Sequence, residues 1–403
     1  METRVEFIPS GGVTSPKGFL AGATSAGIRS KAGDRLDLGI LSSEVHCAAV
    51  AVFTTNQIKA ASVVLCQKRL QGGRAVAVVV NSGCANACTG ESGMADAVEM
   101  TDLTAGRIGV SPDYVLVAST GVIGERLPME RIRAGVGQVV LKADGGHELA
   151  TAIMTTDTVP KEVAVRAGED GFVIGGMAKG SGMIHPELAT MLCFLTTDAS
   201  VDADFLRLAL REAVDISFNM VTVDGDTSPN DMVLIMANGL AAGEAIIPGS
   251  RQGEIFQQAL NQVCINLAKA IARDGEGAGR FIEVTVSGAA SVADARSAAR
   301  TIVGSPLVKA AVHGSDPNWG RVVAAVGRSG AAVVETKINL YMGDICLLND
   351  GCPRRFDRGE VVKLLSNCEV SIALNLNLGS AQATAWGCDL SEEYVTINSQ
   401  YTT

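Results

Sequence analysis

The sequence has no apolar run long enough to cross a membrane and no excess of basic residues. Its longest apolar candidates, residues 47–53 and 75–80, have the length of strands, whereas a transmembrane helix needs about 18 or more apolar residues. Asp and Glu number 43 against 33 Lys and Arg, so the formal net charge is −10. Nucleic acids and anionic membranes bind clustered Lys and Arg. We therefore expect neither a nucleic acid nor a membrane as a partner.

Signals for metal binding and for secretion are also missing. The ten cysteines are irregularly spaced without a CxxC pair, and the closest two, Cys84 and Cys88, are four residues apart. The four histidines, at positions 46, 147, 185 and 313, are scattered and form no zinc ligand set. Residues 1–7 contain two acidic residues and no apolar stretch, unlike a secretory or transit peptide. We expect mostly buried, reduced thiols, no metal site and a cytoplasmic protein.

What the sequence does contain is enough apolar material for a large folded chain. It has 403 residues, of which 47% are hydrophobic and 19% charged, which excludes intrinsic disorder and predicts two or three structural units. Short β-branched runs predict strands at residues 63–66, 76–80, 114–118, 162–166 and 172–174. Apolar stripes predict helices at residues 95–109, 129–141, 205–216 and 254–273, the third capped by Asp202 or Asp204.

The order of these elements indicates an α+β fold rather than a strict alternation of strand and helix. From residue 281 onward the pattern changes to short strands around a helix. We therefore predict a first lobe of residues 1–280 and a smaller α+β domain of residues 281–403.

Three familiar motifs fail on inspection. In residues 176–182 the lysine precedes the glycine, whereas a phosphate-binding Walker loop needs Gly-Lys-Ser/Thr in that order. A calcium loop starting at Asp224 would have Ile235 at its twelfth position, where a bidentate Glu is required. No GxSxG elbow is present, so a serine of the α/β-hydrolase type lacks its signature. An enzyme or binding protein without a metal or a tightly bound cofactor remains.

The segment of residues 179–198 suggests nucleophilic chemistry. Thr190 follows Ala189 and opens an apolar run, with a Gly-rich loop and Pro186 upstream. Attack of the Thr190 hydroxyl on the Ala189 carbonyl would give an ester, and its hydrolysis would leave Thr190 as a new N-terminus. A free α-amine, with a pKa of about 7.7–8.0, suits a general base at neutral pH. Most threonines in apolar strands are explained by β-propensity alone, so the segment by itself favours a structural threonine over a nucleophile.

Further motifs accompany this segment in order along the chain. They are GGVTSPKGF at 11–19, VNSGCANACTG at 80–90, ASTGVIG at 118–124, AIMTTDT at 152–158, DGEGA at 274–278, DPNWGR at 316–321 and NSQYTT at 398–403. Together they resemble the ornithine acetyltransferase family, also called glutamate N-acetyltransferase, of the arginine pathway. The resemblance covers nearly the whole chain. One departure is Cys84, where the family pattern leads us to expect Asn, and it lies outside the residues assigned to catalysis.

The resemblance implies a self-processing acetyltransferase. The chain would cleave between Ala189 and Thr190 into an α chain, residues 1–189, and a β chain, residues 190–403. Thr190 would take acetyl from N2-acetyl-L-ornithine, release ornithine, and give the acetyl group to L-glutamate in a ping-pong reaction. The family's fold is a layered α-β-β-α sandwich, similar to N-terminal-nucleophile enzymes but with distinct connectivity, plus a smaller C-terminal domain. Two α and two β chains would form the assembly. No tightly bound cofactor is implied, although some family members accept acetyl-CoA as a donor.

The resemblance also assigns site residues. Thr120 and Gly121 would stabilise the oxyanion, and Lys179 and Glu276 would contact the substrate. The full set of implied substrate contacts is Thr155 (with Thr156 as an alternative register), Lys179, Thr190, Glu276, Asn398 and Thr403. His185 is expected to be structural, because the α-amine of Thr190 makes a histidine base unnecessary.

Two alternative functions remain open. A self-processed amidohydrolase or aminopeptidase of similar fold would use Thr190 but pass the acyl group to water. A non-catalytic relative would bind the small molecules without turnover.

Overall fold

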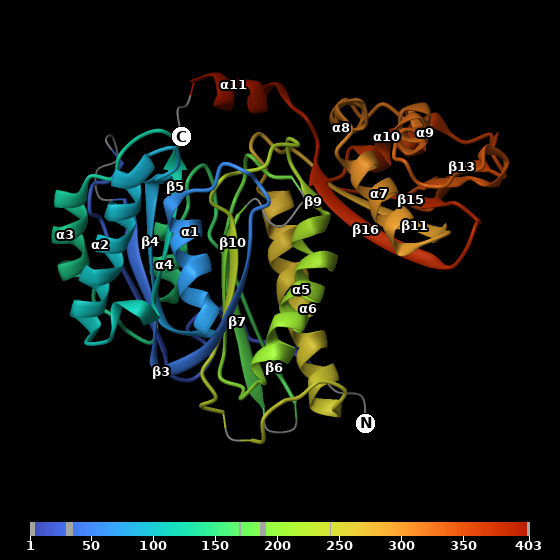
Figure 1. The fold of residues 1–403 in the computed structure, drawn as a ribbon. Coiled ribbons are helices and arrows are strands. Elements are labelled where there is room, and N and C mark those ends of the chain that lie inside the picture. The colour runs from blue at the N-terminus through green and yellow to red at the C-terminus, as the bar shows by residue number, and fades with distance from the viewer. Residues whose placement is uncertain (1–4, 30–34, 169–170, 186–190, 242, 401–403) are drawn as a thin grey trace.

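The computed structural model describes residues 5–29, 35–168, 171–185, 191–241 and 243–400, which form two lobes (Figure 1). Within these residues, no helix is both long and apolar enough to span a membrane.

The first lobe is built on a mixed sheet of nine described strands, in the order β1-β6-β7-β8-β10-β3-β4-β5 with β2 paired to β3. Their bounds are β1 (Glu6–Phe7), β2 (Phe19–Thr24), β3 (Leu38–Phe53), β4 (Arg74–Cys84), β5 (Val115–Val122), β6 (Lys161–Ala167), β7 (Phe172–Lys179), β8 (Leu192–Thr197) and β10 (Met232–Ala237). Its helices are α1 (Ala61–Arg69), α2 (Gly90–Ile108), α3 (Met129–Gln138), α4 (Gly146–Ala152), α5 (Ala203–Ile216) and α6 (Arg251–Arg273).

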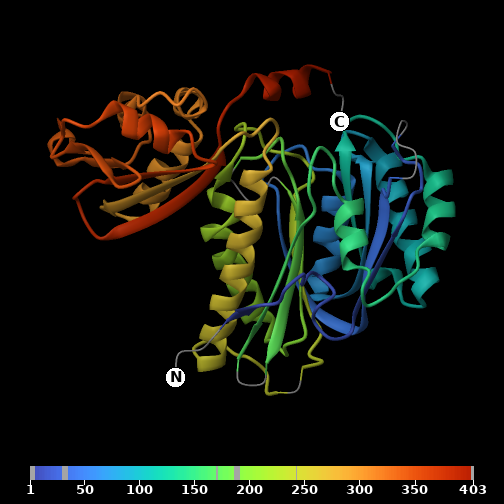
Figure 2. The ribbon, with the colours of Figure 1, turned by 180° about the vertical axis from the view of Figure 1, so that it is seen from behind.

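The long strand β3 divides this sheet into two facing β layers. Its first half pairs with β2, its second half pairs with β10, and the register against β4 shifts between Ser42 and Cys47. Phe194 of β8 and Ile40 of β3 belong to one buried cluster, which also includes residues of α1, α2 and α3. Leu195 belongs to a second cluster, with residues of α5 and α6. Helices α1, α2 and α3 cover the outer face of the other layer (Figure 2). The expected α-β-β-α layering and α+β class are confirmed.

Helices α5 and α6, which pack against each other, form where the apolar stripes predict them. Along α6, Phe256, Leu260, Val263, Leu267 and Ile271 are all buried. Helix α5 is capped by the Asp202 carboxylate, which accepts hydrogen bonds from the backbone N–H groups of residues 204 and 205. The predicted helices at 95–109 and 129–141 correspond to α2 and α3.

One predicted strand is wrong. Residues 63–66 lie inside helix α1 rather than in a strand. Val63 and Cys66, three residues apart, are buried while Val64 is 43% exposed, which is a helical pattern that a four-residue apolar run disguises. The Cys66 thiol contacts β5, where it accepts a hydrogen bond from the Val117 N–H at 3.3 Å. The remaining predicted strands fall in β4, β5, β6 and β7.

The second lobe carries a sheet of seven described strands, in the order β14-β13-β12-β15-β11-β16-β9. Its elements are β9 (Val221–Thr222), β11 (Phe281–Ala289), α7 (Val292–Val303), α8 (Pro306–His313), α9 (Trp319–Gly327), β12 (Asn339–Met342), β13 (Ile345–Asn349), β14 (Cys352–Pro353), α10 (Arg358–Leu365), β15 (Glu369–Asn375) and β16 (Ala381–Cys388). Across both lobes, short 3-10 helices lie at Leu70–Gly72, Pro112–Tyr114, Phe218–Met220 and Glu335–Lys337.

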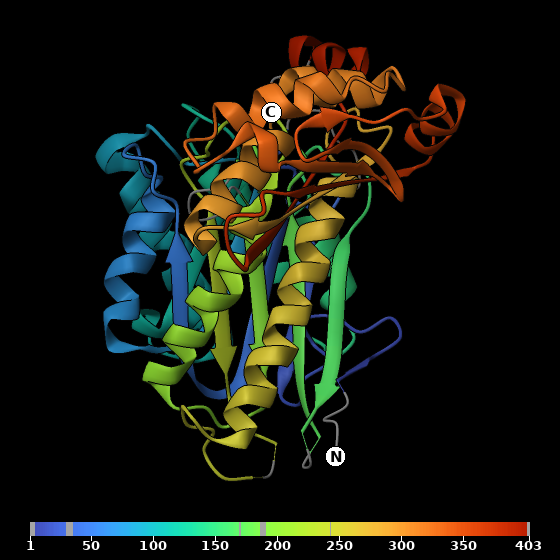
Figure 3. The same cartoon turned by 90° about the vertical axis from the view of Figure 1, so that its right-hand side faces the viewer.

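A boundary at residue 281 assigns two segments to the wrong lobe. Strand β9 comes from the first part of the chain but pairs with β16. Helix α11 (Glu392–Gln400) leaves the second lobe and extends across the end of the first (Figures 1 and 3). Strand β11 begins at Phe281, so a sheet change does occur there, yet the last helix reaches back to the first lobe.

Candidate active site

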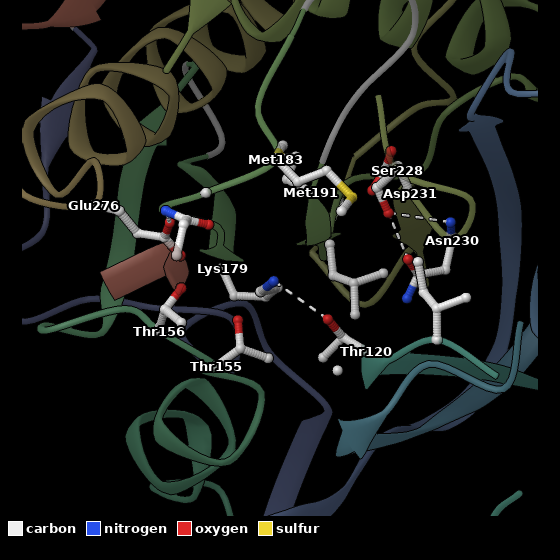
Figure 4. A pocket seen from close by; sticks show the side chains of 15 residues that line it. Thr120, Thr155, Thr156, Lys179, Met183, Met191, Ser228, Asn230, Asp231 and Glu276 are labelled. Carbon is white, nitrogen blue, oxygen red and sulfur yellow. Dashed lines mark hydrogen bonds between the residues drawn. The ribbon is translucent and has the colours of Figure 1, made fainter. Parts of the chain in front are cut away.

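A pocket lies at the end of the first lobe where β5, β7 and the start of β8 meet (Figure 4). The residues that line it are Thr120, Gly121, Ile123, Thr155, Thr156, Lys179, Gly182, Met183, Met191, Leu192, Ser228, Asn230, Asp231, Glu276 and Asn398. The predicted site residues Thr120, Gly121, Thr155, Lys179, Glu276 and Asn398 are all among them. Ala189, Thr190 and Thr403 lie outside the described residues.

The start of β8 brings the chain into this pocket. Met191 and Leu192 both line it, and the Met191 carbonyl accepts a hydrogen bond from the Met232 N–H at 3.0 Å. Leu192 pairs with Lys179 on one side and with Met232 on the other. The residue that precedes Met191 in the sequence is Thr190.

Strand β5 ends in the pair of residues predicted to stabilise an oxyanion. Gly121 has a φ of +127°, and a Cβ built on it would lie 2.3 Å from the backbone carbon of Gly83 on β4, so only glycine fits. The hydroxyl oxygen of Thr120 accepts a hydrogen bond from Lys179 Nζ at 3.2 Å. Because an ammonium donates only, the Thr120 hydroxyl keeps its own proton for another acceptor.

Lys179 supplies the positive charge of the pocket. Burial lowers the pKa of its ammonium, while the neighbouring carboxyl groups of Asp157, first, and Asp231 oppose that effect. A partly desolvated ammonium at this position can bind a substrate carboxylate.

The two neighbouring threonines differ in their partners. The Thr156 hydroxyl is hydrogen-bonded to that of Ser181 at 2.7 Å. The Thr155 hydroxyl makes no hydrogen bond to any other described residue, and the Thr155 N–H donates to Asp157 Oδ2 at 2.9 Å. Both threonines line the pocket, so the choice of Thr155 over Thr156 as a substrate contact stays a prediction.

Glu276 and Asn398 reach the pocket from different parts of the chain. Asn398 on α11 donates from Nδ2 to Glu276 Oε2 at 2.7 Å, so the last described helix contributes to the site. Glu276 is only 9% exposed, and a Cβ on Gly182 would lie 2.4 Å from its carboxyl group. The glycine thus makes room for a carboxylate that can pair with a cationic substrate group.

Asp231 is a pocket residue that sequence reasoning missed. It is 3% exposed, its Oδ2 makes no hydrogen bond within the described part of the chain, and burial raises its pKa well above the usual range. Beside it, Asn230 Nδ2 donates to the Ser119 carbonyl and ties this loop to β5. The polar run from Asp224 to Asp231 is the sequence signal that could have drawn attention to this loop.

Asp224, the first residue of the rejected calcium motif, has a structural role in this loop. The Asp224 carboxylate accepts hydrogen bonds from the Met183 and Ile184 N–H groups at 2.6 and 3.0 Å, which fixes the loop that follows Lys179. Within the described residues, no group of three or more His, Cys, Asp or Glu side chains could hold a metal ion. The Nδ1 atom of His185 lies 3.3 Å from the Thr222 hydroxyl oxygen, and His185 does not line the pocket.

A family model and two curated proteins match this chain over nearly its full length, and one solved structure matches about half of it. The ArgJ family model matches residues 20–403. The arginine biosynthesis bifunctional protein ArgJ of Dehalococcoides mccartyi is 54% identical, with 100% of both chains covered. The protein of the same name from Symbiobacterium thermophilum is also 54% identical, covering 98% of this chain and 99% of its own. A crystal structure of the Bacillus halodurans protein is 46% identical, with a TM-score of 0.51, and covers 52% of this chain and 98% of its own.

Proposed function

This chain belongs to the ArgJ family, and from that premise we propose that it transfers the acetyl group of N2-acetyl-L-ornithine to L-glutamate. It is an acyltransferase of arginine biosynthesis that acts on small molecules. One observation carries the proposal. Thr120, Lys179, Glu276 and Asn398 converge on one pocket at the start of β8, immediately after Thr190 in the sequence.

In the first half-reaction Thr190 is the nucleophile. Its α-amine accepts the proton of its own hydroxyl, and the oxygen attacks the acetyl carbonyl of N-acetylornithine. The Thr120 hydroxyl and the Gly121 N–H stabilise the negative charge on the carbonyl oxygen. Collapse of this intermediate breaks the amide bond, the departing nitrogen takes the proton, and ornithine leaves behind an acetyl ester on Thr190.

In the second half-reaction the α-amine of glutamate attacks the ester. The same oxyanion donors act again, N-acetylglutamate is released, and the Thr190 hydroxyl recovers its proton. Both the substrate and the product are amides, and the acetyl ester on Thr190 is the intermediate between them. It divides one difficult transfer into two steps of lower barrier.

The charges of the pocket match a zwitterionic amino-acid substrate. The Lys179 ammonium binds the α-carboxylate, and the Glu276 carboxylate binds the ornithine side-chain ammonium. The Thr155 hydroxyl and the Asn398 amide supply further hydrogen bonds, and Thr403 is the remaining proposed contact.

Self-cleavage between Ala189 and Thr190 creates the nucleophile's free amine. The Bacillus halodurans crystal chain supports this step, because it aligns over 98% of its own length yet spans only 52% of this chain, as a processed fragment would. The two products, residues 1–189 and 190–403, assemble as a heterotetramer of two copies each in the cytoplasm. No tightly bound cofactor is required, and acetyl-CoA is a second acetyl donor, in keeping with the word bifunctional in the names of the relatives.

An isotope-transfer assay tests this function. The purified protein is incubated with N-acetylornithine carrying a deuterated acetyl group, with and without glutamate, and the products are measured by mass spectrometry. Labelled N-acetylglutamate and free ornithine are expected. Labelled acetate at a rate unaffected by glutamate would support the amidohydrolase alternative instead. Binding without any turnover would support a non-catalytic relative.

A further inference from the structure

A cluster of three buried charged side chains lies behind the pocket. Lys161, at the start of β6, donates from Nζ to Asp157 Oδ1 at 2.7 Å and to Asp274 Oδ2 at 2.5 Å. The side chain of Lys161 is 1% exposed, and those of Asp157 and Asp274 are 0% and 6% exposed. Buried ion pairs are costly to desolvate, and apolar replacements are often as stable, so stability alone is a weak reason for this cluster.

Asp157 connects the cluster to two segments that line the pocket. Its Oδ2 accepts a hydrogen bond from the Thr155 N–H at 2.9 Å, and its Oδ1 accepts one from the Gly180 N–H at 2.6 Å. Gly180 follows Lys179 directly. One carboxylate therefore sets the backbone spacing between Thr155 and Lys179.

Asp274 connects the cluster to the third segment. It accepts hydrogen bonds from the Thr158 N–H, at 3.1 Å, and from the Thr158 hydroxyl, and it lies two residues before Glu276. The Glu276 N–H in turn donates to the Ser181 carbonyl at 2.9 Å. The segments that carry Thr155, Lys179 and Glu276 are thus joined in a closed circuit of hydrogen bonds.

We propose that Asp157 is a positioning residue for acetyl transfer, which acts with Lys161 and Asp274 to hold Thr155, Lys179 and Glu276 at fixed mutual distances in the pocket. The inference rests on the proposed function, since these three residues are the proposed substrate contacts. Misplacement of a bound substrate by about 1 Å can cost about 10²-fold in rate, so the spacing matters for catalysis.

The cluster also affects the charge of Lys179. Asp157 and Asp231 raise the pKa of the Lys179 ammonium, while burial, Lys161 and Arg29 lower it, and the net direction is downward. The carboxylate of Glu276 lines the same pocket. At pH values below its pKa, Lys179 is charged and can bind a carboxylate. This binding is lost as the pH rises through the pKa of Lys179. Neutralising Asp157 lowers the pKa of Lys179 further, so the alkaline loss of activity moves to lower pH.

Asp157 itself stays ionised throughout the working range. Burial alone would raise its pKa, but the charges of Lys161 and Lys179 and the Gly180 N–H outweigh burial and lower the pKa to about 2. The variant Asp157→Asn therefore removes a charge that the wild-type protein carries at every pH of the assay, while it keeps one oxygen as an acceptor.

The test compares Asp157→Asn with the matched control Asp198→Asn. Asp198 is also a buried carboxylate that joins two backbone segments, through the Lys17 N–H at 3.0 Å and the Val173 N–H at 2.8 Å, but it lies at the opposite end of β7. Rates are measured from pH 6 to 10 with N-acetylornithine and glutamate and are normalised to the amount of the 190–403 fragment. We expect Asp157→Asn to raise the KM for N-acetylornithine and to lower kcat/KM about 10²-fold. The alkaline limb of its pH–rate profile should move to lower pH. Asp198→Asn should keep the wild-type KM and pH profile.

Other outcomes decide against the inference. A wild-type KM and pH profile for Asp157→Asn would overturn it, as would equal losses in both variants without any shift of the alkaline limb. Should Asp157→Asn fail to fold or to cleave, Asp157→Glu decides, because it keeps the charge but lengthens the side chain. It should raise KM and leave the alkaline limb in place, and a wild-type KM would refute the positioning role. Absence of transfer by the wild-type protein would contradict the proposed function instead. In that case the affinity of each variant for ornithine, measured by calorimetry, takes the place of KM in the comparison.

Discussion

Replacing Thr120 by valine should remove most of the acetyl-transfer rate and leave the fold intact. The substitution exchanges a hydroxyl for a methyl group of similar size at a residue that is 6% exposed. Lys179 Nζ donates to the Thr120 oxygen at 3.2 Å, which leaves the hydroxyl proton to be donated to the oxyanion. Valine offers neither the acceptor nor the donor.

The magnitude follows from the role of that proton. Loss of one oxyanion donor typically lowers kcat about 10²–10³-fold, which corresponds to about 2.7–4 kcal/mol of transition-state stabilisation. The KM should change little, because the donor acts on charge that develops during the reaction. The hydrogen bond lost to the Lys179 ammonium costs about 1.5–3 kcal/mol of stability, less than the total of a typical domain.

The assay is steady-state transfer from N-acetylornithine to glutamate, with the cleaved fraction of each preparation determined by intact mass. Thr120→Ser is the control, since it retains the hydroxyl and should keep most of the wild-type kcat. A kcat for Thr120→Val equal to that of the wild-type protein would refute the assignment of Thr120 to the oxyanion site. A loss shared equally by the serine variant would indicate a packing role.

Two further predictions test the cation of the pocket and the cap of helix α5. Lys179→Met should raise the KM for N-acetylornithine about 10–100-fold, because a hydrogen bond to a charged group contributes about 1.5–3 kcal/mol, and an unchanged KM in initial-rate measurements would exclude Lys179 as the carboxylate contact. Asp202→Ala removes the cap of α5, whose carboxylate accepts from the Asp204 and Phe205 N–H groups at 3.1 and 2.9 Å. It should lower the free energy of unfolding by about 1 kcal/mol in urea titrations without altering transfer kinetics, and a kinetic effect would contradict a purely structural cap.

Elements with a long, regular pattern could be predicted from the sequence. Helix α6 shows its apolar stripe over several turns, and Asp202 provides a clear start for α5. The prediction of a strand at residues 63–66 was wrong, because four apolar residues fit a strand and a buried helix equally well. The role of β9 in the second sheet also depends on pairing with β16, which no local pattern encodes.

The pocket was predictable to the extent that residue types in ordered motifs resemble a known family. That resemblance indicated Thr120, Lys179 and Glu276 although they are far apart in the sequence. It did not indicate Asp231 or the Asp157–Lys161 pair. Both depend on burial, and a carboxylate or a lysine in a sequence is by default a solvated surface charge. Only the tertiary structure shows that these charges are enclosed.

The central claim is that Thr190 becomes a free N-terminal residue and carries the acetyl group, and intact-mass analysis tests it most directly. The wild-type protein is measured beside Thr190→Ala, before and after incubation with N-acetylornithine in the absence of glutamate. We predict two wild-type fragments, residues 1–189 and 190–403, of which only the second gains the mass of one acetyl group and loses it when glutamate is added. Thr190→Ala should remain one uncut chain. An uncut wild-type chain, or an acetyl group on the first fragment, would contradict the account.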